Sequence, residues 1–421
     1  MVSNSNGSTL SKNGNGTIAQ PRKVQRILLV QPNMRWVEWN FKTLWEIHPL
    51  NLCMIAATVE DRYEISILDA NIDDLSQDEF RSKVIEIAPD LVGITLLTME
   101  YGKTAHICSS LVKQADPNIV TILGGIYVTQ AHDIAGADEN LDYLVLGEGE
   151  YTFPALLDYI EGKGPRPELG IGYWQDGKRI VQPKPPFIQD LDSLPLPAYH
   201  LADFDRYTTT LQRISVDSPR ALPYARMITS RGCPVGCTFC EVESISGGPF
   251  RTRSVEHVMS ELRYMKQRYG IKAVVWDDDN LFLKRSRTKA LFRAMIDEKL
   301  DLKWNGLAVP VFTMTDEIIE IFAESGCQYL DFAIESGVDR ILKDIVHKPV
   351  NLETVAPLVA KAQSLGIDVN CHFIIGFPGE TWDEIRQTIS YAESLQADYT
   401  KFFIYQPLPH TPLGDKLLAD G

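Results

Sequence analysis

Three cysteines, Cys233, Cys237 and Cys240, lie within eight residues of one another near the middle of the chain. Glycine and proline residues between and beside them oppose helix formation, so we expect a loop that can turn three sulfurs towards one point. Thiolates suit zinc or an iron–sulfur cluster, and three of them leave one metal position open for a substrate or cosubstrate. The spacing therefore predicts an open metal centre. Three ordinary cysteines, or a zinc site completed by His257, are the alternatives.

The composition restricts the classes of protein to which the chain can belong. It has 421 residues, 44% hydrophobic and 23% charged, which is ordinary for a globular protein of two or three domains. A net charge of −15 argues against a nucleic-acid partner. Residues 1–22 lack the apolar core of a signal peptide and predict a disordered tail, and no apolar run reaches transmembrane length. Seven cysteines without a disulfide pattern fit a reducing compartment, so we expect a cytoplasmic protein.

Residues 23–164 alternate short apolar segments with helical patterns. Such segments, bounded by turn residues, are typical of buried parallel strands. The predicted strands are Ile27–Val30, Ile65–Asp69, Leu91–Thr95, Ile119–Leu123 and Tyr143–Leu146. Five strand–helix repeats predict a doubly wound, Rossmann-like α/β domain.

Ligands of such domains bind at the carboxyl ends of the strands, where glycines let a large ligand approach the backbone. The candidate binding residues at these ends are Asp69, Thr95, Gly124, Gly125, Gly147, Glu148 and Gly149. No Gly-x-Gly-x-x-Gly follows the first strand, so a dinucleotide is disfavoured. A flavodoxin-like fold with these glycines as plain turns is the alternative.

Residues 165–221 differ in character from the segments on either side. Gly170–Val181 predicts a hairpin with a two-residue turn, and the proline-rich stretch that follows predicts an extended crossing segment. We expect a linker without catalytic residues.

Residues 222–421 resume the strand–helix alternation. The predicted strands are Ala225–Thr229, Lys272–Trp276, Leu302–Leu307, Tyr329–Ile334, Asp368–Ile375 and Thr400–Tyr405. Six β/α units predict a partial (β/α)6 barrel, and active sites of such barrels form at the carboxyl ends of the strands.

The pattern C-x-x-x-C-x-aromatic-C resembles the signature of the radical S-adenosylmethionine (SAM) enzymes. The resemblance implies that the three cysteines hold a [4Fe–4S] cluster whose fourth iron is chelated by SAM. It further implies that an electron from the cluster cleaves SAM to a 5′-deoxyadenosyl radical. A partial six-stranded barrel is the fold of this family.

The same resemblance assigns SAM contacts to residues near the strand ends. It implies that Phe239 lies near the adenine, that Asp278 and Asp279 bind the ammonium, and that Glu335 with Ser336 meets the ribose. Gly376 and Pro378 belong to a segment similar to the family's adenine-side loop. For the carboxylates of residues 277–279, a solvated acidic turn is the alternative.

The N-terminal strand-end loops resemble those of the family's cobalamin-binding subfamily, on the segments Leu68–Ala70, Gly124–Gly125 and Leu146–Glu150. This resemblance implies a cobalamin-dependent enzyme that methylates an unactivated carbon, or phosphorus, of a small molecule. One SAM supplies the methyl group through cobalamin, and a second supplies the radical. It also implies an electron donor such as flavodoxin or ferredoxin. A ring-closing or rearranging enzyme without methyl transfer, and a non-catalytic cobalamin sensor or carrier, are the alternatives.

One departure concerns the lower face of the cobalt. Cobalamin mutases carry Asp-x-His-x-x-Gly after the first strand, whereas this chain has Pro32–Trp36 there, without histidine. We therefore expect no histidine ligand below the cobalt, and we interpret the nearby His48 as a packed residue at a helix start.

Overall fold

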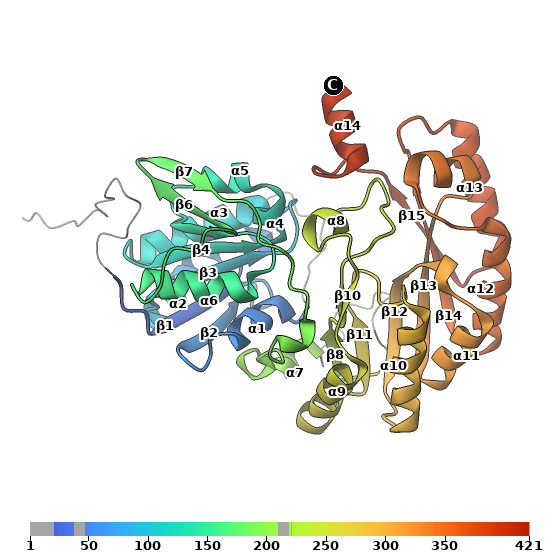
Figure 1. The fold of residues 1–421 in the computed structure, drawn as a ribbon, viewed down its shortest axis with the longest axis horizontal. Coiled ribbons are helices and arrows are strands. Elements are labelled where there is room, and N and C mark those ends of the chain that lie inside the picture. Colours follow the sequence, from blue (N-terminus) through green and yellow to red (C-terminus); the bar gives the residue numbers. More distant parts are fainter. Residues whose placement is uncertain (1–20, 38–46, 209–218, 220, 421) are drawn as a thin grey trace, which may run out of the picture. The chain divides into compact units, whose positions relative to one another are not determined.

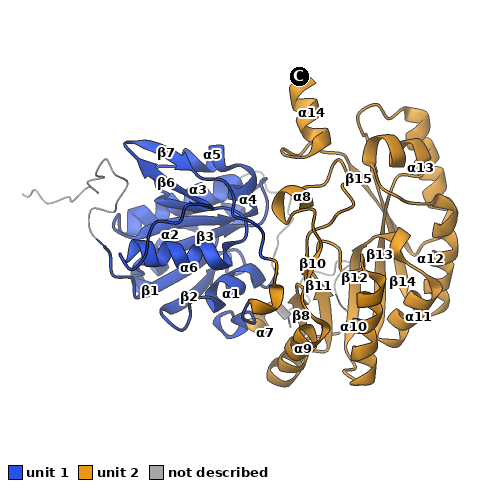
Figure 2. Ribbon diagram, viewed as in Figure 1, with its two compact units in different colours: residues 1–188, 194–202 blue, residues 189–193, 203–421 orange. Residues whose placement is uncertain are grey.

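The computed structural model describes residues 21–37, 47–208, 219 and 221–420. The chain forms two compact units, of which unit 1 comprises residues 1–188 and 194–202, and unit 2 comprises residues 189–193 and 203–421 (Figure 2). Most of the predicted disordered tail lies outside the described residues. The segment 165–221, predicted as a linker, is divided between the two units.

Unit 1 is built on a seven-stranded sheet in the order β2-β1-β3-β4-β5-β6-β7 (Figure 1). Its strands are β1 (Arg26–Gln31), β2 (Glu64–Asp69), β3 (Leu91–Leu96), β4 (Val120–Gly125), β5 (Tyr143–Val145), β6 (Ile171–Gln175) and β7 (Lys178–Val181). The strands β1 to β5 are parallel to one another, as the alternation of strand and helix predicted. Their carboxyl ends consequently lie at one edge of the sheet.

Helices cover both faces of this sheet. They are α1 (Leu50–Ala57), α2 (Gln77–Ile87), α3 (Gly102–Ala115), α4 (Ile126–Gln130), α5 (His132–Gly136) and α6 (Gly149–Ile160). Successive residues of β1 belong to different cores: Leu28 and Val30 pack in the core that contains residues of α2 and α3, and Leu29 packs with residues of α1 and α6. Because strand side chains alternate between faces, both faces are buried, and the doubly wound prediction is confirmed.

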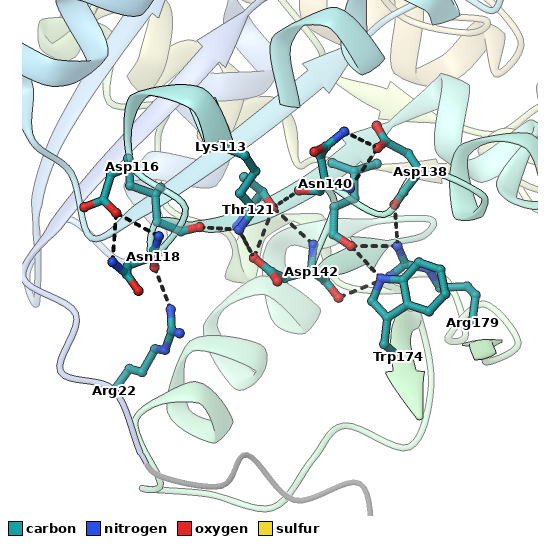
Figure 3. A network of polar contacts seen from close by, with 12 residues as sticks. Arg22, Lys113, Asp116, Asn118, Thr121, Asp138, Asn140, Asp142, Trp174 and Arg179 are labelled. Carbon is teal, nitrogen blue, oxygen red and sulfur yellow. Dashed lines mark hydrogen bonds and ion pairs between the residues drawn. The ribbon is translucent and has the colours of Figure 1, made fainter. Parts of the chain in front are cut away.

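The hairpin β6–β7 extends the sheet of unit 1, with β6 antiparallel to β5. A polar network holds it there (Figure 3). The Arg179 guanidinium lies over the ring of Trp174, 4.2 Å from its centroid, and donates to the backbone carbonyls of Gly136, Asp138, Leu141 and Asp142. Beside it, Lys113 donates to Asp142 Oδ2 at 2.6 Å. The predicted hairpin therefore belongs to the sheet and not to a free crossing segment.

Unit 2 is a six-stranded parallel sheet in the order β15-β14-β13-β12-β11-β8. The strands are β8 (Tyr224–Met227), β11 (Ala273–Trp276), β12 (Lys303–Val309), β13 (Cys327–Glu335), β14 (Asp368–Ile375) and β15 (Tyr399–Ile404). Within the described residues β15 and β8 are not paired, so the barrel is open, as predicted.

From α9 onwards, the helices of unit 2 alternate with its strands. They are α7 (Phe204–Thr208), α8 (Val242–Ile245), α9 (Val255–Tyr269), α10 (Arg285–Asp297), α11 (Asp316–Glu324), α12 (Val355–Ser364), α13 (Trp382–Ser394) and α14 (Pro412–Asp420), and α9 to α13 run along one side of the sheet (Figure 1). Local sequence explains several of their ends. Thr381 and Glu384 form a capping box at the start of α13, and Gly270 ends α9 with φ +62°.

A short antiparallel ribbon, β9 (Ser230–Arg231) with β10 (Arg251–Thr252), follows β8. The cysteine loop lies between β9 and α8 and is thus anchored in the barrel unit at both ends. No helix in the described ranges is long and apolar enough to cross a membrane.

Candidate functional site

The cysteine loop is shaped by two glycines in the left-handed region. Gly232 has φ +85° and Gly236 φ +72°. At Gly232 a Cβ would lie 2.3 Å from the carbonyl oxygen of Pro249, so only glycine fits there. The amide of Cys233 then donates to the Gly247 carbonyl at 3.1 Å. The loop is therefore held to the segment that leads into β10.

The three loop cysteines differ from the other four in exposure. All seven are free thiols, but Cys233, Cys237 and Cys240 are partly exposed, whereas the remainder are buried. Burial raises the pKa of Cys237 to about 12 and that of Cys240 to about 11, although a hydrogen bond from the Val242 backbone lowers the latter. Iron must therefore displace thiol protons when it binds.

The donor set fits an iron–sulfur cluster better than a single ion. In the described part of the chain no three His, Cys, Asp or Glu side chains are arranged to hold one metal ion. A cluster binds each thiolate through a different iron, so its ligands lie further apart than those of a mononuclear site. Three soft ligands on one loop suit that larger group.

Asp278, which follows β11, holds the start of the cysteine loop through one carboxylate oxygen. Its Oδ1 accepts from the Thr229 amide at 3.0 Å, the Thr229 hydroxyl at 2.8 Å and the Ser230 hydroxyl. Its Oδ2 is buried and has no hydrogen-bond partner among the described residues. Burial raises the pKa of Asp278 to about 6, and the hydroxyls of Ser230 and Thr229 oppose that rise. The unpaired oxygen fits a ligand that donates a hydrogen bond.

Asp279 meets the next part of the loop: its Oδ2 accepts from the Gly232 amide at 2.8 Å. Asp277 is different, because it pairs with Arg226, whose Nε lies 2.6 Å from Asp277 Oδ2. The acidic turn is therefore a hydrogen-bonded element whose three aspartates are partly exposed, and its role in binding SAM stays a prediction.

Glu335 and Ser336 end β13 at the same edge of the barrel. Glu335 is buried, has φ +74°, and receives a salt bridge from Lys348 Nζ at 2.6 Å. Its Oε2 has no hydrogen bond within the described chain. Ser336 is fully buried, with its hydroxyl 3.2 Å from Thr388 Oγ1 and 3.2 Å from the Val338 amide. Glu335 Oε2 is thus left without a hydrogen bond among the described residues, whereas the hydroxyl of Ser336 bonds within the protein. Sequence reasoning missed Lys348.

The cysteine loop packs against the loop that follows β14. The rings of Phe239 and Phe377 are 5.8 Å apart, and Phe377 lies 5.2 Å from Tyr405. Phe377 stands between the predicted residues Gly376 and Pro378, and Gly376 has φ +82°. The structure therefore brings Phe239 to the predicted adenine-side loop, but through a ring that the sequence prediction did not select.

A buried charged group lies on β13 and β14. His372 Nδ1 is 2.9 Å from Asp331 Oδ1, and His372 Nε2 is 3.9 Å from Glu335 Oε2. Burial lowers the pKa of His372, but the hydrogen bond to Asp331 and the charge of Glu335 outweigh it, so the pKa is raised overall. Asn370 Nδ2 also donates to Asp331.

In unit 1, all seven predicted binding residues follow or end the parallel strands β2 to β5 at their carboxyl edge. Three of these side chains already accept hydrogen bonds from other residues of unit 1. Asp69 Oδ1 accepts from the amides of Asn71 and Ile72 at 2.9 and 3.0 Å, Thr95 Oγ1 accepts from Asn51, and Glu148 accepts from the Ile188 amide at 2.6 Å. These three side chains therefore stabilise the loops at the strand ends through hydrogen bonds.

The glycines at this edge divide into two kinds. At Gly125, with φ +94°, a Cβ would meet the Leu96 carbonyl oxygen and Thr95 Oγ1 at 2.8 Å each. At Gly124 the nearest atom to a Cβ would be the Val145 carbonyl oxygen at 3.8 Å. Gly124 therefore leaves room beside the backbone that a ligand can use.

Two further residues bear on a cofactor at this edge. Gln31, at the end of β1, is buried, and its Nε2 has no hydrogen-bond partner among the described residues. Such a donor suits the amide-rich periphery of a corrin ring. His48 is buried with its ring 5.5 Å from that of Tyr199, in agreement with the interpretation of a packed histidine.

Comparison with known proteins decides between the families that these sites allow. A model described as "Radical SAM superfamily" matches residues 227–392, and one described as "B12 binding domain" matches residues 42–157. An uncharacterized methyltransferase of Pyrococcus horikoshii is 32% identical over 375 residues, which cover 89% of this chain and 79% of the relative. The chain belongs to the cobalamin-dependent radical SAM family.

Two other comparisons agree with this assignment. The cytidylyl-2-hydroxyethylphosphonate methyltransferase of Streptomyces wedmorensis is 30% identical, over 95% of this chain and 82% of that protein. The solved structure of TsrM from Kitasatospora setae, a radical SAM methyltransferase with tryptophan and a SAM analogue bound, shares the fold. Its TM-score is 0.78 at 18% identity, over 94% of this chain and 76% of that chain.

The predicted family, fold and cofactors are confirmed. The chain is a radical SAM enzyme of the cobalamin-dependent methyltransferase type, with SAM, a [4Fe–4S] cluster and cobalamin as cofactors. The residues that contact them remain predictions.

Proposed function

We propose that this enzyme methylates an unactivated carbon, or phosphorus, of a small molecule, with the cluster and SAM in unit 2 and cobalamin in unit 1. The observation that carries the proposal is the arrangement of side chains at the carboxyl ends of the barrel strands. Three partly exposed thiols lie on a glycine-shaped loop, beside a phenylalanine pair and a buried carboxylate with an unpaired oxygen.

Within unit 2 each residue has a proposed task. Cys233, Cys237 and Cys240 hold three irons. Asp278 Oδ2 accepts from the ammonium of SAM, since that oxygen is buried and lacks a donor among the described residues. Glu335 accepts from the ribose through Oε2, which has no hydrogen bond among the described residues, and Lys348 neutralises its charge.

Within unit 1 the proposed cobalamin site is the carboxyl edge of the sheet. Gly124 offers space, and Gln31 offers a buried donor. When bound, the cluster supplies the electron that cleaves SAM, and cobalamin carries the methyl group to be transferred. The buried position of His48 against Tyr199 supports a cobalt without a histidine ligand.

We also propose that flavodoxin or ferredoxin delivers the electron and that the protein works in the cytoplasm, where its free cysteines stay reduced. The Streptomyces wedmorensis relative acts on cytidylyl-2-hydroxyethylphosphonate, so a nucleotidyl phosphonate is the first small molecule to try as a substrate.

The proposed cluster site is tested by single alanine variants after anaerobic reconstitution. Cys233→Ala, Cys237→Ala and Cys240→Ala should each lose most of the iron and all cleavage of SAM to 5′-deoxyadenosine. Cys327→Ala removes a buried thiol of β13 and should retain both. Wild-type iron content in Cys240→Ala, or equal loss in Cys327→Ala, would overturn the assignment.

A further inference from the structure

Asn280 closes the turn that supports the cysteine loop. Asp278 binds Thr229 and Ser230, Asp279 binds Gly232, and Asn280 Nδ2 lies 3.3 Å from the sulfur of Cys233. Successive side chains of the turn thus meet successive positions of the loop. The first two contacts are to backbone amides and hydroxyls, whereas the third is to a proposed cluster ligand.

The amide of Asn280 can face this sulfur in only one chemically favourable way. The residue is 7% exposed, and its Oδ1 is buried without a hydrogen-bond partner among the described residues. If the amide were reversed, its oxygen would face a thiolate once iron is bound, and two acceptors would oppose each other. The hydrogen bond from the Asn280 N–H to the sulfur is therefore stronger when Cys233 binds iron as a thiolate.

We propose that Asn280 donates an N–H···S hydrogen bond to the Cys233 thiolate and thereby raises the reduction potential of the cluster. This inference rests on the proposed function, because it takes Cys233 as a ligand. It makes Asn280 a positioning residue that tunes the electron-transfer step and does not itself contact SAM or substrate.

The physical reason is the charge that reduction adds. One electron makes the cluster and its thiolates more negative, and the positive end of an N–H dipole stabilises that state more than the oxidised one. Asn280 follows three consecutive aspartates, Asp277 to Asp279. A fourth carboxylate at this position would oppose electron uptake, whereas the neutral amide assists it.

The test uses the full chain, reconstituted anaerobically, and measures iron content and the midpoint potential by EPR-monitored redox titration. Asn280→Leu keeps the size of the side chain and removes the donor, so its cluster should assemble and have a more negative potential. Asn280→Asp keeps the shape and adds charge, so its potential should be lower still. If Asn280→Leu assembles its cluster poorly, the potential of Asn280→Asp alone tests the proposal.

Ser230→Ala is the matched control. It removes a hydroxyl that supports the same loop through Asp278 but leaves the sulfur contact intact, so its potential should equal that of the wild type. A wild-type potential in both Asn280 variants, or an equal shift in Ser230→Ala, would overturn the inference and leave the proposed function standing. A wild-type protein that binds no iron would instead contradict the proposed cluster site.

Discussion

Asp278 and Glu335 are the two carboxylates proposed to bind SAM, and each also forms hydrogen bonds within the fold. In each carboxylate one oxygen is tied to the protein and the other is buried without a hydrogen bond in the described chain. A buried unpaired acceptor costs about 1–3 kcal/mol. Such positions are therefore destabilised until a donor arrives, which is what a binding residue for an ammonium or a hydroxyl requires.

The pair His372–Asp331 gives a prediction about pH. Because the pKa of His372 is raised in the folded protein, its charge contributes stability that is fully present below the unfolded pKa of about 6.5 and is lost as pH rises through the folded pKa. The groups around it are Asp331, Glu335, Lys348 and Asn370. His372→Gln should thus lower the stability by about 1–3 kcal/mol in the acidic range.

Thermal unfolding of the cluster-free protein between roughly pH 5.5 and pH 9 checks this, because that range spans the titration of a histidine. The difference in midpoint between wild type and His372→Gln should narrow as pH rises. If the difference in midpoint stayed constant or widened as pH rises, it would contradict the predicted loss of stabilisation by His372 at high pH.

Residue types and spacing indicated the three cysteines and the polar strand ends as candidate site residues. They did not reveal Lys348, Phe377 or Asn280. Lys348 is 13 residues from its partner Glu335, and the contact of Asn280 with Cys233 spans 47 positions. Such contacts depend on how strands and loops meet in space, which the spacing of motif residues does not encode.

At the scale of elements, the cysteine loop contains two left-handed glycines, Gly232 and Gly236, which differ in how close other atoms lie to them. Gly232→Ala places a Cβ 2.3 Å from a backbone carbonyl oxygen, so the loop must move, whereas nothing lies within 4 Å of a Cβ at Gly236. Gly236→Ala should cost only the left-handed strain of about 1–2 kcal/mol. We expect Gly232→Ala to lose most of its iron and Gly236→Ala to keep it, as measured after reconstitution.

Equal iron content in the two variants would show that the shape of the loop is not set by the close approach at Gly232.

The glycines that end β4 give a similar contrast in unit 1. Gly124→Ala meets nothing closer than 3.8 Å, so the fold should be unaffected while the added methyl group occupies proposed cofactor space. Gly125→Ala, at φ +94° and 2.8 Å from Leu96 O, should destabilise unit 1 itself. We expect Gly124→Ala to unfold at the wild-type temperature but to bind less cobalamin, as judged by its absorption spectrum. The control is Gly177→Ala in the hairpin turn, which has φ +75° and nothing within 4 Å: it adds left-handed strain away from the strand ends and should still bind cobalamin.

Full cobalamin loading of Gly124→Ala would place the cofactor elsewhere on the edge.

Elements were predicted best where local sequence determines them. The capping boxes at Ser76 and Thr381 fix the starts of α2 and α13, and the repeated apolar segments predicted the parallel strands of both sheets. The pairing of β6 with β5 was not predicted, because a hairpin signal does not specify which strand its outer edge will meet.

At the scale of the whole molecule, two units with separate folds are matched by two family models in the same chain. A methyltransferase of this type must consume SAM in two ways. Transfer of its methyl group leaves S-adenosylhomocysteine, and reductive cleavage leaves 5′-deoxyadenosine and methionine. We therefore expect both chemistries from one polypeptide.

The measurement that tests this claim most directly is mass spectrometry of the SAM-derived products from the reconstituted, cobalamin-loaded chain with a reductant and a substrate that it modifies. We predict comparable amounts of S-adenosylhomocysteine and 5′-deoxyadenosine, together with transfer of deuterium from the reacting carbon into 5′-deoxyadenosine. Formation of 5′-deoxyadenosine without S-adenosylhomocysteine would contradict methyl transfer and favour ring closure or rearrangement.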